Sequence, residues 1–231
     1  MEFYGEKLCF VSEMHYFCII IEIELEMTFL EFKEKMFDLA CFSTYQIYAW
    51  QPSFDRSNLT RWVKKGYIIS LRQGYYAFAE YKNMPNFALY FANRIYRPSY
   101  ISLHTALSFY GMIPEAVVQI NSVTSLKTSS FKNDFGLYSY NTIKENLMFG
   151  YDLKPMLDNR TIYFATAEKA LLDLLYLYPF YNSVEEMEGL RLDEDFLHED
   201  LNKDLLMDYC SRFENKALEL RVDLLLKTYD L

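Results

Sequence analysis

Two helix starts and two helix stops fall within the short stretch from Ser43 to Gly66. Ser43 is a favourable N-cap, and Gln46, three residues later, completes a capping box. The helix that begins there must end just before Pro52, because a proline disfavours helical geometry at the residue preceding it. Asp55 then provides a second N-cap. Two helices this close together leave few arrangements open to the fold.

The second of these helices has an apolar face and a polar face. Leu59, Trp62 and Val63 have the spacing of one buried stripe, and Gly66 is expected to end the helix in the left-handed conformation. The opposite face carries basic and hydroxyl side chains, which suit the major groove of DNA. We also expect the helix N-terminus to attract a phosphate. The predicted DNA contacts are Arg56, Ser57, Thr60, Arg61, Lys64 and Lys65, together with Arg72 and Gln73 at the tip of the next element.

That next element is a predicted hairpin, since two β-rich runs in residues 67–78 surround a turn that contains Gly74. An amphipathic helix over residues 29–40 precedes the whole group. The order of helix, short helix, capped helix and hairpin is typical of a winged helix-turn-helix, which we place at residues 27–80. Two alternatives stay open: the basic face is only a solvated surface, or the unit binds protein instead of DNA.

Charge is distributed unevenly along the 231 residues, whose net charge is −9. Residues 1–26 carry −5, residues 27–100 carry +5, and the remaining residues carry −9. A basic module followed by an acidic one fits a DNA-binding unit joined to a partner-facing body. We interpret residues 1–26 as an N-terminal extension, with an extra strand at most, and Met27 as the expected native start.

The rest of the chain mixes helices and strands, which predicts an α+β fold with strands grouped ahead of a helical tail. Residues 81–99 are expected to form a connector, and residues 100–231 a second domain. The predicted elements are a helix over 87–96, a helix from Ser102 to Gly111, strands near 117–124, 135–140 and 161–165, and a helix over 167–178 capped by Thr166. In the tail, one apolar stripe comprises Leu201, Leu205, Tyr209 and Phe213, and another Leu218, Val222, Leu225 and Tyr229.

Several classes of function find no support. The four cysteines and three histidines lack metal-ligand or disulfide spacing, so we expect neither a metal site nor a cofactor. We expect the cysteines to be reduced thiols in a cytoplasmic protein. The apolar run at residues 17–21 is too short to span a bilayer, so no membrane association is expected. No phosphate-binding loop or nucleophile motif is present, and the acidic run at residues 193–195 is expected to be solvated. We therefore predict no catalytic residues.

Three stretches of the chain carry a family resemblance. The stretches are Leu59-Thr-Arg61-Trp62-Val-Lys-Lys-Gly66-Tyr-Ile with Arg72-Gln-Gly74-Tyr-Tyr, then Tyr100-Ile-Ser102-Leu-His-Thr-Ala106-Leu107-Ser-Phe-Tyr110-Gly111, and Ala165-Thr166-Ala167-Glu168-Lys169-Ala170-Leu171-Leu172-Asp173-Leu174-Leu175. They resemble the AbiEi-type antitoxins of bacterial type IV toxin–antitoxin (abortive infection) systems, and the likeness covers about residues 28–230. In the third stretch, Ala167 stands where the family usually has proline, and both residues suit the first position of a helix.

The resemblance implies two activities: binding of operator DNA to repress the chain's own operon, and neutralisation of a nucleotidyltransferase-like toxin without a stable complex. It also marks Glu168, Lys169 and Asp173 as candidate antitoxin residues. A structural alternative stays open for these three, in which Glu168 serves the helix dipole and the other two form a surface ion pair. The alternative for the whole chain is a stand-alone winged-helix regulator whose C-terminal half binds a ligand or a protein.

Overall fold

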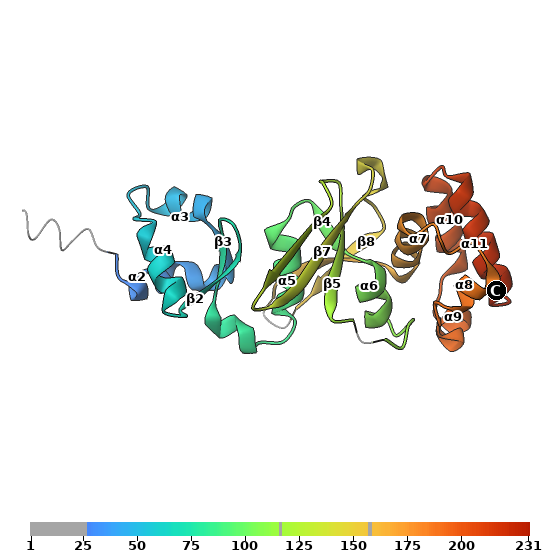
Figure 1. Ribbon diagram of the computed structural model, residues 1–231, viewed down its shortest axis with the longest axis horizontal. Coiled ribbons are helices and arrows are strands. Elements are labelled where there is room, and N and C mark those ends of the chain that lie inside the picture. The colour runs from blue at the N-terminus through green and yellow to red at the C-terminus, as the bar shows by residue number, and fades with distance from the viewer. Residues whose placement is uncertain (1–26, 116, 157–158) are drawn as a thin grey trace, which may run out of the picture.

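The computed structural model describes residues 27–115, 117–156 and 159–231, which form an α+β chain with two sheets. Figure 1 shows an N-terminal unit (residues 27–83) at one end, a six-stranded central sheet in the middle, and a group of helices at the other end. The N-terminal unit contains α2 (Phe29–Met36), η1 (Phe37–Leu39), β1 (Cys41–Ser43), α3 (Thr44–Trp50), α4 (Ser57–Lys64), β2 (Ile68–Arg72), β3 (Tyr75–Phe78) and η2 (Ala79–Asn83).

The elements that follow belong to the central sheet and the helices around it. The sheet region contains α5 (Phe87–Ile95), β4 (Ser99–Ile101), α6 (Leu103–Phe109), β5 (Gln119–Thr124), β6 (Ser129–Asn133), β7 (Gly136–Thr142), η3 (Glu145–Leu147), β8 (Tyr151–Pro155) and β9 (Thr161–Ala165). The helical end contains α7 (Ala167–Leu177), α8 (Val184–Glu188), α9 (Glu194–Glu199), α10 (Lys203–Arg212) and α11 (Lys216–Thr228).

The short-range signals around α3 and α4 act as predicted. The Ser43 hydroxyl accepts the backbone N–H of Gln46 at 3.3 Å, and the Ser43 N–H donates to the Gln46 side chain at 2.9 Å. This capping box starts α3. At the end of α4, Gly66 has a φ of +72°, and the N–H of Tyr67 reaches back to the carbonyl of Trp62 at 3.0 Å. Both ends are set by residues close in the chain.

Gly66→Ala should therefore destabilise the protein by about 1–2 kcal/mol, because an alanine Cβ disfavours the left-handed conformation. Apart from the two chain neighbours, no atom of the described residues lies within 4 Å of the position a Cβ would take, so backbone strain would produce the loss. Urea unfolding followed by circular dichroism measures it. The neighbouring exposed Lys65→Ala serves as a control, and equal stabilities for the two variants would contradict the assigned role of Gly66.

Two details of the N-terminal unit differ from expectation. The three residues of β1 form a third strand, which pairs antiparallel with β3 and places it at the centre of the order β1-β3-β2. In addition, α4 begins at Ser57 with Arg56 in the N-cap position, although we expected Asp55 there. The Asp55 carboxylate still accepts the N–H of Ser57 at 2.8 Å, so the expected residue caps the helix from one position earlier.

An aromatic cluster fills the core of the N-terminal unit. The indole of Trp62, only 3% exposed, lies 4.7 Å from the ring of Phe32, 5.3 Å from Phe29 and 5.9 Å from Phe54, measured between ring centroids. Leu59 is buried beside it, and Val63 is half-buried. The predicted apolar face of α4 is therefore the buried face.

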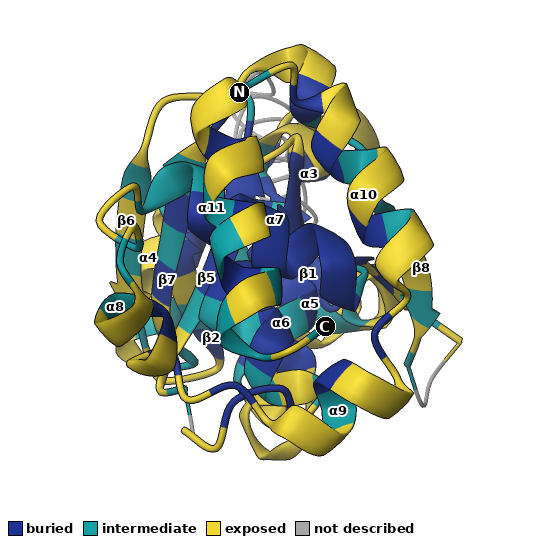
Figure 2. Cartoon of the chain, turned by 90° about the vertical axis from the view of Figure 1, so that its right-hand side faces the viewer, coloured by how far each residue is buried: buried dark blue, intermediate teal, exposed yellow. Residues whose placement is uncertain are grey.

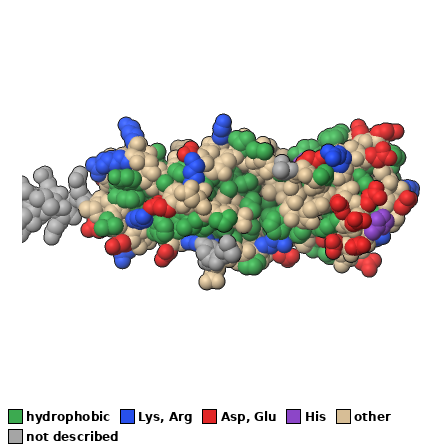
Figure 3. All heavy atoms as spheres, turned by 90° about the horizontal axis from the view of Figure 1, so that it is seen from below, with side chains coloured by type: hydrophobic (Ala, Val, Ile, Leu, Met, Phe, Trp, Pro, Cys, Tyr) green, Lys and Arg blue, Asp and Glu red, His purple; other side chains and the backbone are tan. Residues whose placement is uncertain are grey.

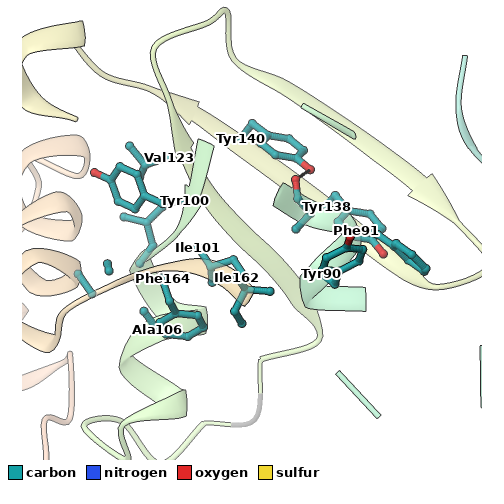
Figure 4. Packing of buried hydrophobic residues seen from close by; sticks show 14 of the residues in the cluster. Tyr90, Phe91, Tyr100, Ile101, Ala106, Val123, Tyr138, Tyr140, Ile162 and Phe164 are labelled. Carbon is teal, nitrogen blue, oxygen red and sulfur yellow. Dashed lines mark hydrogen bonds between the residues drawn. The ribbon is translucent and has the colours of Figure 1, made fainter. Parts of the chain in front are cut away.

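The central sheet has the strand order β6-β7-β5-β4-β9-β8, with parallel pairs β5–β7 and β4–β9. The predicted strand over 161–165 matches β9, whereas β4, β6 and β8 are additional strands. Figure 4 shows Tyr138 and Tyr140 of β7 beside Phe91 of α5. The segment expected to be a connector thus contains a helix that packs on the sheet, and the hydroxyl of Tyr140 donates to the carbonyl of Ala92 at 2.8 Å.

The helix α7 is buried on all sides rather than along one stripe, since each of residues 167–175 is buried. Figure 2 shows it in dark blue among the surrounding helices. In the tail, three residues of one predicted stripe, Leu218, Val222 and Leu225, are buried, and the fourth, Tyr229, is half-buried. The other predicted stripe is confirmed in part: Leu201 and Phe213 are buried, Leu205 and Tyr209 are half-buried, and α10 instead buries Leu206 and Cys210.

The interpretation of residues 1–26 as an extension with an extra strand concerns residues outside those described. Across the described ranges, every helix is too short or too polar to cross a membrane.

Candidate functional site

Most of the predicted DNA contacts gather on the outer face of α4. Ser57, Thr60, Arg61 and Lys64 follow the spacing of one helical stripe and are exposed, on the side opposite the buried Leu59. Two more of the predicted contacts, Arg56 and Lys65, are exposed at the ends of the same helix. Six of the eight predicted side chains therefore share one surface, which we call the α4 surface.

A carboxylate occupies the start of α4. The Asp55 side chain accepts the N–H of Ser57 at 2.8 Å and its hydroxyl at 2.5 Å. These hydrogen bonds lower the pKa of Asp55. The bond from the Ser57 hydroxyl has the larger effect, the bond from the Ser57 N–H the next, and the Arg61 charge lowers the pKa further. At this helix terminus, where a phosphate was expected, an ionised carboxylate therefore already accepts the first free amide.

A hydrogen bond within α4 orients its central arginine. The guanidinium of Arg61 donates to the side-chain oxygen of Asn58, one turn earlier. Asn58 is itself buried, beside Leu59 and close to Trp62 in the chain. Asn58 thus directs Arg61 along the outer face of the helix.

The two residues predicted at the hairpin tip are placed differently from each other. The Arg72 guanidinium lies 4.9 Å from the ring centre of Tyr75, 5.5 Å from that of Tyr96 and 5.4 Å from that of Phe131. Two of these rings belong to the sheet region, so Arg72 packs at the junction between the N-terminal unit and the central sheet. Gln73 is exposed beside it. The predicted pair is therefore split, and Arg72 does not extend from the α4 surface.

The three residues marked by the family resemblance are buried within α7. Lys169 and Asp173 are both 0% exposed and form an ion pair within α7. Asp173 also accepts the hydroxyls of Tyr100 at 2.9 Å and Ser102 at 2.8 Å, and the Lys169 ammonium donates to Tyr100 at 2.9 Å. The expectation of a surface ion pair was wrong, because helices and the central sheet enclose α7. Glu168, also buried, accepts the N–H of Asn202 at 3.1 Å.

Burial and neighbouring charges shift the pKa values of the side chains in this cluster. Burial lowers the pKa of Lys169, while Asp173 acts in the opposite direction. Burial also raises the pKa of Tyr100 well above its usual value, with a further contribution from Asp173, so this phenol stays protonated and donates. The rings of Phe149 and Phe213, with centres 5.0 and 4.8 Å from the ammonium, complete the enclosure.

The sequence did not indicate that Tyr100 and Ser102 are partners of Lys169 and Asp173. Ser102 holds the N-cap position of α6, at the predicted start of that helix, but its hydroxyl donates to Asp173 rather than capping the helix. The cluster thereby ties β4 and the start of α6 to α7. Because the cluster is fully buried, its role is to hold these elements together in the protein interior.

Comparisons with known proteins add no assignment: no family model matches the chain, and no curated protein matches it. The described residues also contain no group of three or more histidine, cysteine, aspartate or glutamate side chains arranged to hold a metal ion.

Proposed function

We propose that the N-terminal unit is a winged helix-turn-helix that binds double-stranded DNA. In this proposal α3 and α4 form the helix-turn-helix, and the β2–β3 hairpin forms the wing. The observation that carries it is the α4 surface, where hydroxyl and basic side chains occupy the whole outer face while Leu59 and Trp62 anchor the inner face.

Each part of the α4 surface has a role suited to its chemistry. Arg61 lies mid-helix, where a guanidinium can donate two hydrogen bonds to a guanine edge in the major groove. The flexible ammonium groups of Lys64 and Lys65 suit backbone phosphates, which accept a point charge from many directions. Because Arg72 packs at the junction, the exposed Gln73 is the main side chain of the wing that would contact DNA.

The charge distribution supports one orientation on DNA. The basic segment, residues 27–100, includes α4, whereas the residues after it carry nine net negative charges. Figure 3 shows acidic side chains gathered at the end formed by the C-terminal helices, and Figure 1 places α4 at the other end. Repulsion by the DNA phosphates would turn the acidic end outward and present α4 to the groove.

Specific DNA binding is expected on the DNA upstream of the chain's own gene, measured by fluorescence anisotropy against unrelated competitor DNA. Arg61→Ala should weaken it by about 1–3 kcal/mol if the guanidinium reads a base. Affinity should also fall steeply with salt, because phosphate contacts release counterions. Arg191→Ala is a matched control, since Arg191 is an exposed arginine paired with Glu115. Equal affinities for the two variants would remove Arg61 from the interface, and binding without salt dependence would favour a protein partner.

We further propose that the chain is an AbiEi-type antitoxin which represses its own operon and counteracts a nucleotidyltransferase-like toxin. The support is the resemblance of residues 59–75, 100–111 and 165–175 to that family. The last two stretches meet in the structure, where Tyr100 and Ser102 contact Asp173. Co-expression with a neighbouring nucleotidyltransferase-like gene tests this: rescue of growth supports an antitoxin, and its absence leaves a stand-alone regulator.

A further inference from the structure

A cleft of about 490 Å³ separates the N-terminal unit from α5 and the start of β9. Arg94 and Arg97 line it from α5 and the residues after it, and Arg160 lines it from the segment before β9. Ser43 and Gln46 belong to the wall formed by the N-terminal unit. Three guanidinium groups thus border one small cavity that the sequence motifs did not identify.

The charges of Arg94 and Arg97 are not neutralised by the surrounding protein. Across the described ranges, neither guanidinium lies within ion-pair distance of a carboxylate. The Arg94 guanidinium lies 4.6 Å from the ring centre of Tyr90, and the Arg97 Nε–H donates to the carbonyl of Asn93 at 3.1 Å. These contacts hold both side chains in place and leave most of their N–H groups available.

The other polar groups of the cleft supply less negative charge than the arginines supply positive charge. Asp38 contributes one carboxylate to the lining, against the guanidinium groups of Arg94, Arg97 and Arg160, and the backbone carbonyl of Asp38 accepts a hydrogen bond from Arg160 at 2.5 Å. Cys41 also lines the cleft, but burial raises the pKa of its thiol to about 12 despite the opposing charges of Arg94 and Arg97. The thiol is therefore neutral near pH 7, and positive charge prevails in the cleft.

We propose that this cleft is a binding site for a phosphate group, held chiefly by Arg94 and Arg97. A guanidinium matches the oxygens of phosphate with paired hydrogen bonds, and its charge persists at every physiological pH. Gln46 adds an exposed amide, whose oxygen faces Ser43 in the capping box and whose nitrogen is available as a donor. The volume suits a small ligand.

The phosphate has two chemical sources, a phosphorylated small molecule or the backbone of bound DNA. Because the cleft walls come from both the N-terminal unit and α5, a small molecule there would contact the N-terminal unit and α5 together. This inference does not depend on the DNA-binding proposal, since a phosphorylated small molecule requires no DNA.

Isothermal titration of the full chain with inorganic pyrophosphate tests the site. Saturable binding at millimolar or lower concentration is expected, and Arg97→Gln should weaken it about tenfold or more, as expected for a lost charge-assisted hydrogen bond. The Arg94→Gln/Arg97→Gln double variant should abolish it, and Arg191→Gln should leave it unchanged. Because Arg97 is exposed, its single variant keeps the test valid even if the double variant folds poorly.

A second arm identifies the source of the phosphate. Displacement of a bound DNA duplex by pyrophosphate, with weaker duplex binding by Arg97→Gln, would assign the site to the DNA backbone. Pyrophosphate binding with unchanged duplex affinity, or with no duplex binding at all, would assign it to a small molecule. Absence of saturable pyrophosphate binding, or binding equally strong in folded Arg97→Gln and double variants, would overturn the proposal.

Discussion

Asp173→Ala is expected to destabilise the protein by about 3–5 kcal/mol, because it leaves the Lys169 ammonium buried without its carboxylate. The same change removes the acceptor of the Tyr100 and Ser102 hydroxyls, which join β4 and the start of α6 to α7. Urea unfolding monitored by circular dichroism measures the loss.

The loss should diminish as the pH rises. In the variant, burial still lowers the pKa of Lys169, and the opposing effect of Asp173 is gone. The unfolded chain then binds more protons than the folded one, so stability increases as the pH rises towards the ordinary lysine pKa of 10.5. The control is the double variant Lys169→Met/Asp173→Leu, which should be far closer to the parent because it removes both charges. A harmless Asp173→Ala variant, or a double variant as unstable as the single one, would contradict an energetically coupled pair.

Trp62→Ala should destabilise the N-terminal unit by about 3–5 kcal/mol, as a large truncation in a packed core. Its indole meets the rings of Phe29, Phe32 and Phe54, so the substitution removes the centre of the aromatic cluster. Thermal unfolding, followed by the near-ultraviolet signal of the aromatic side chains, reports the change.

The second tryptophan provides a matched control. Trp50 ends α3 and is 36% exposed, whereas Trp62 is 3% exposed. Trp50→Ala should therefore cost clearly less than Trp62→Ala, since less apolar surface is lost from the core. Similar losses for the two variants would show that burial of the indole does not set the stability of this unit.

Several helix boundaries were predictable because each depends on residues only a few positions apart. The capping box of Ser43 and Gln46, the left-handed Gly66 and the cap at Thr166 are all of this kind, and all are present. The side of α4 that faces solvent followed from its apolar periodicity. The exposed part of the candidate site could thus be derived from local pattern alone.

The features that were missed depend on contacts between distant parts of the chain. The spacing of Lys169 and Asp173 indicated an ion pair, but its burial depends on β4, whose Tyr100 lies 73 positions before Asp173. The position of Arg72 likewise depends on rings from Tyr96 and Phe131. Strand β1 has three residues, too few for an alternating pattern to reveal it.

The junction between the N-terminal unit and the central sheet is fastened at several points besides Arg72. The side chain of Asn133 donates to the carbonyl of Leu71 at 3.0 Å, and Lys82 pairs with Asp134 at 3.5 Å. A unit held this way cannot swivel freely on a tether. If the chain binds DNA as proposed, and two copies also contact each other on one inverted repeat, the phasing of the half-sites along the DNA helical repeat would be set by the protein. Adding half a turn of DNA between the half-sites would then place the second copy on the opposite side of the duplex, and the fastened junction would give it little freedom to reach its partner.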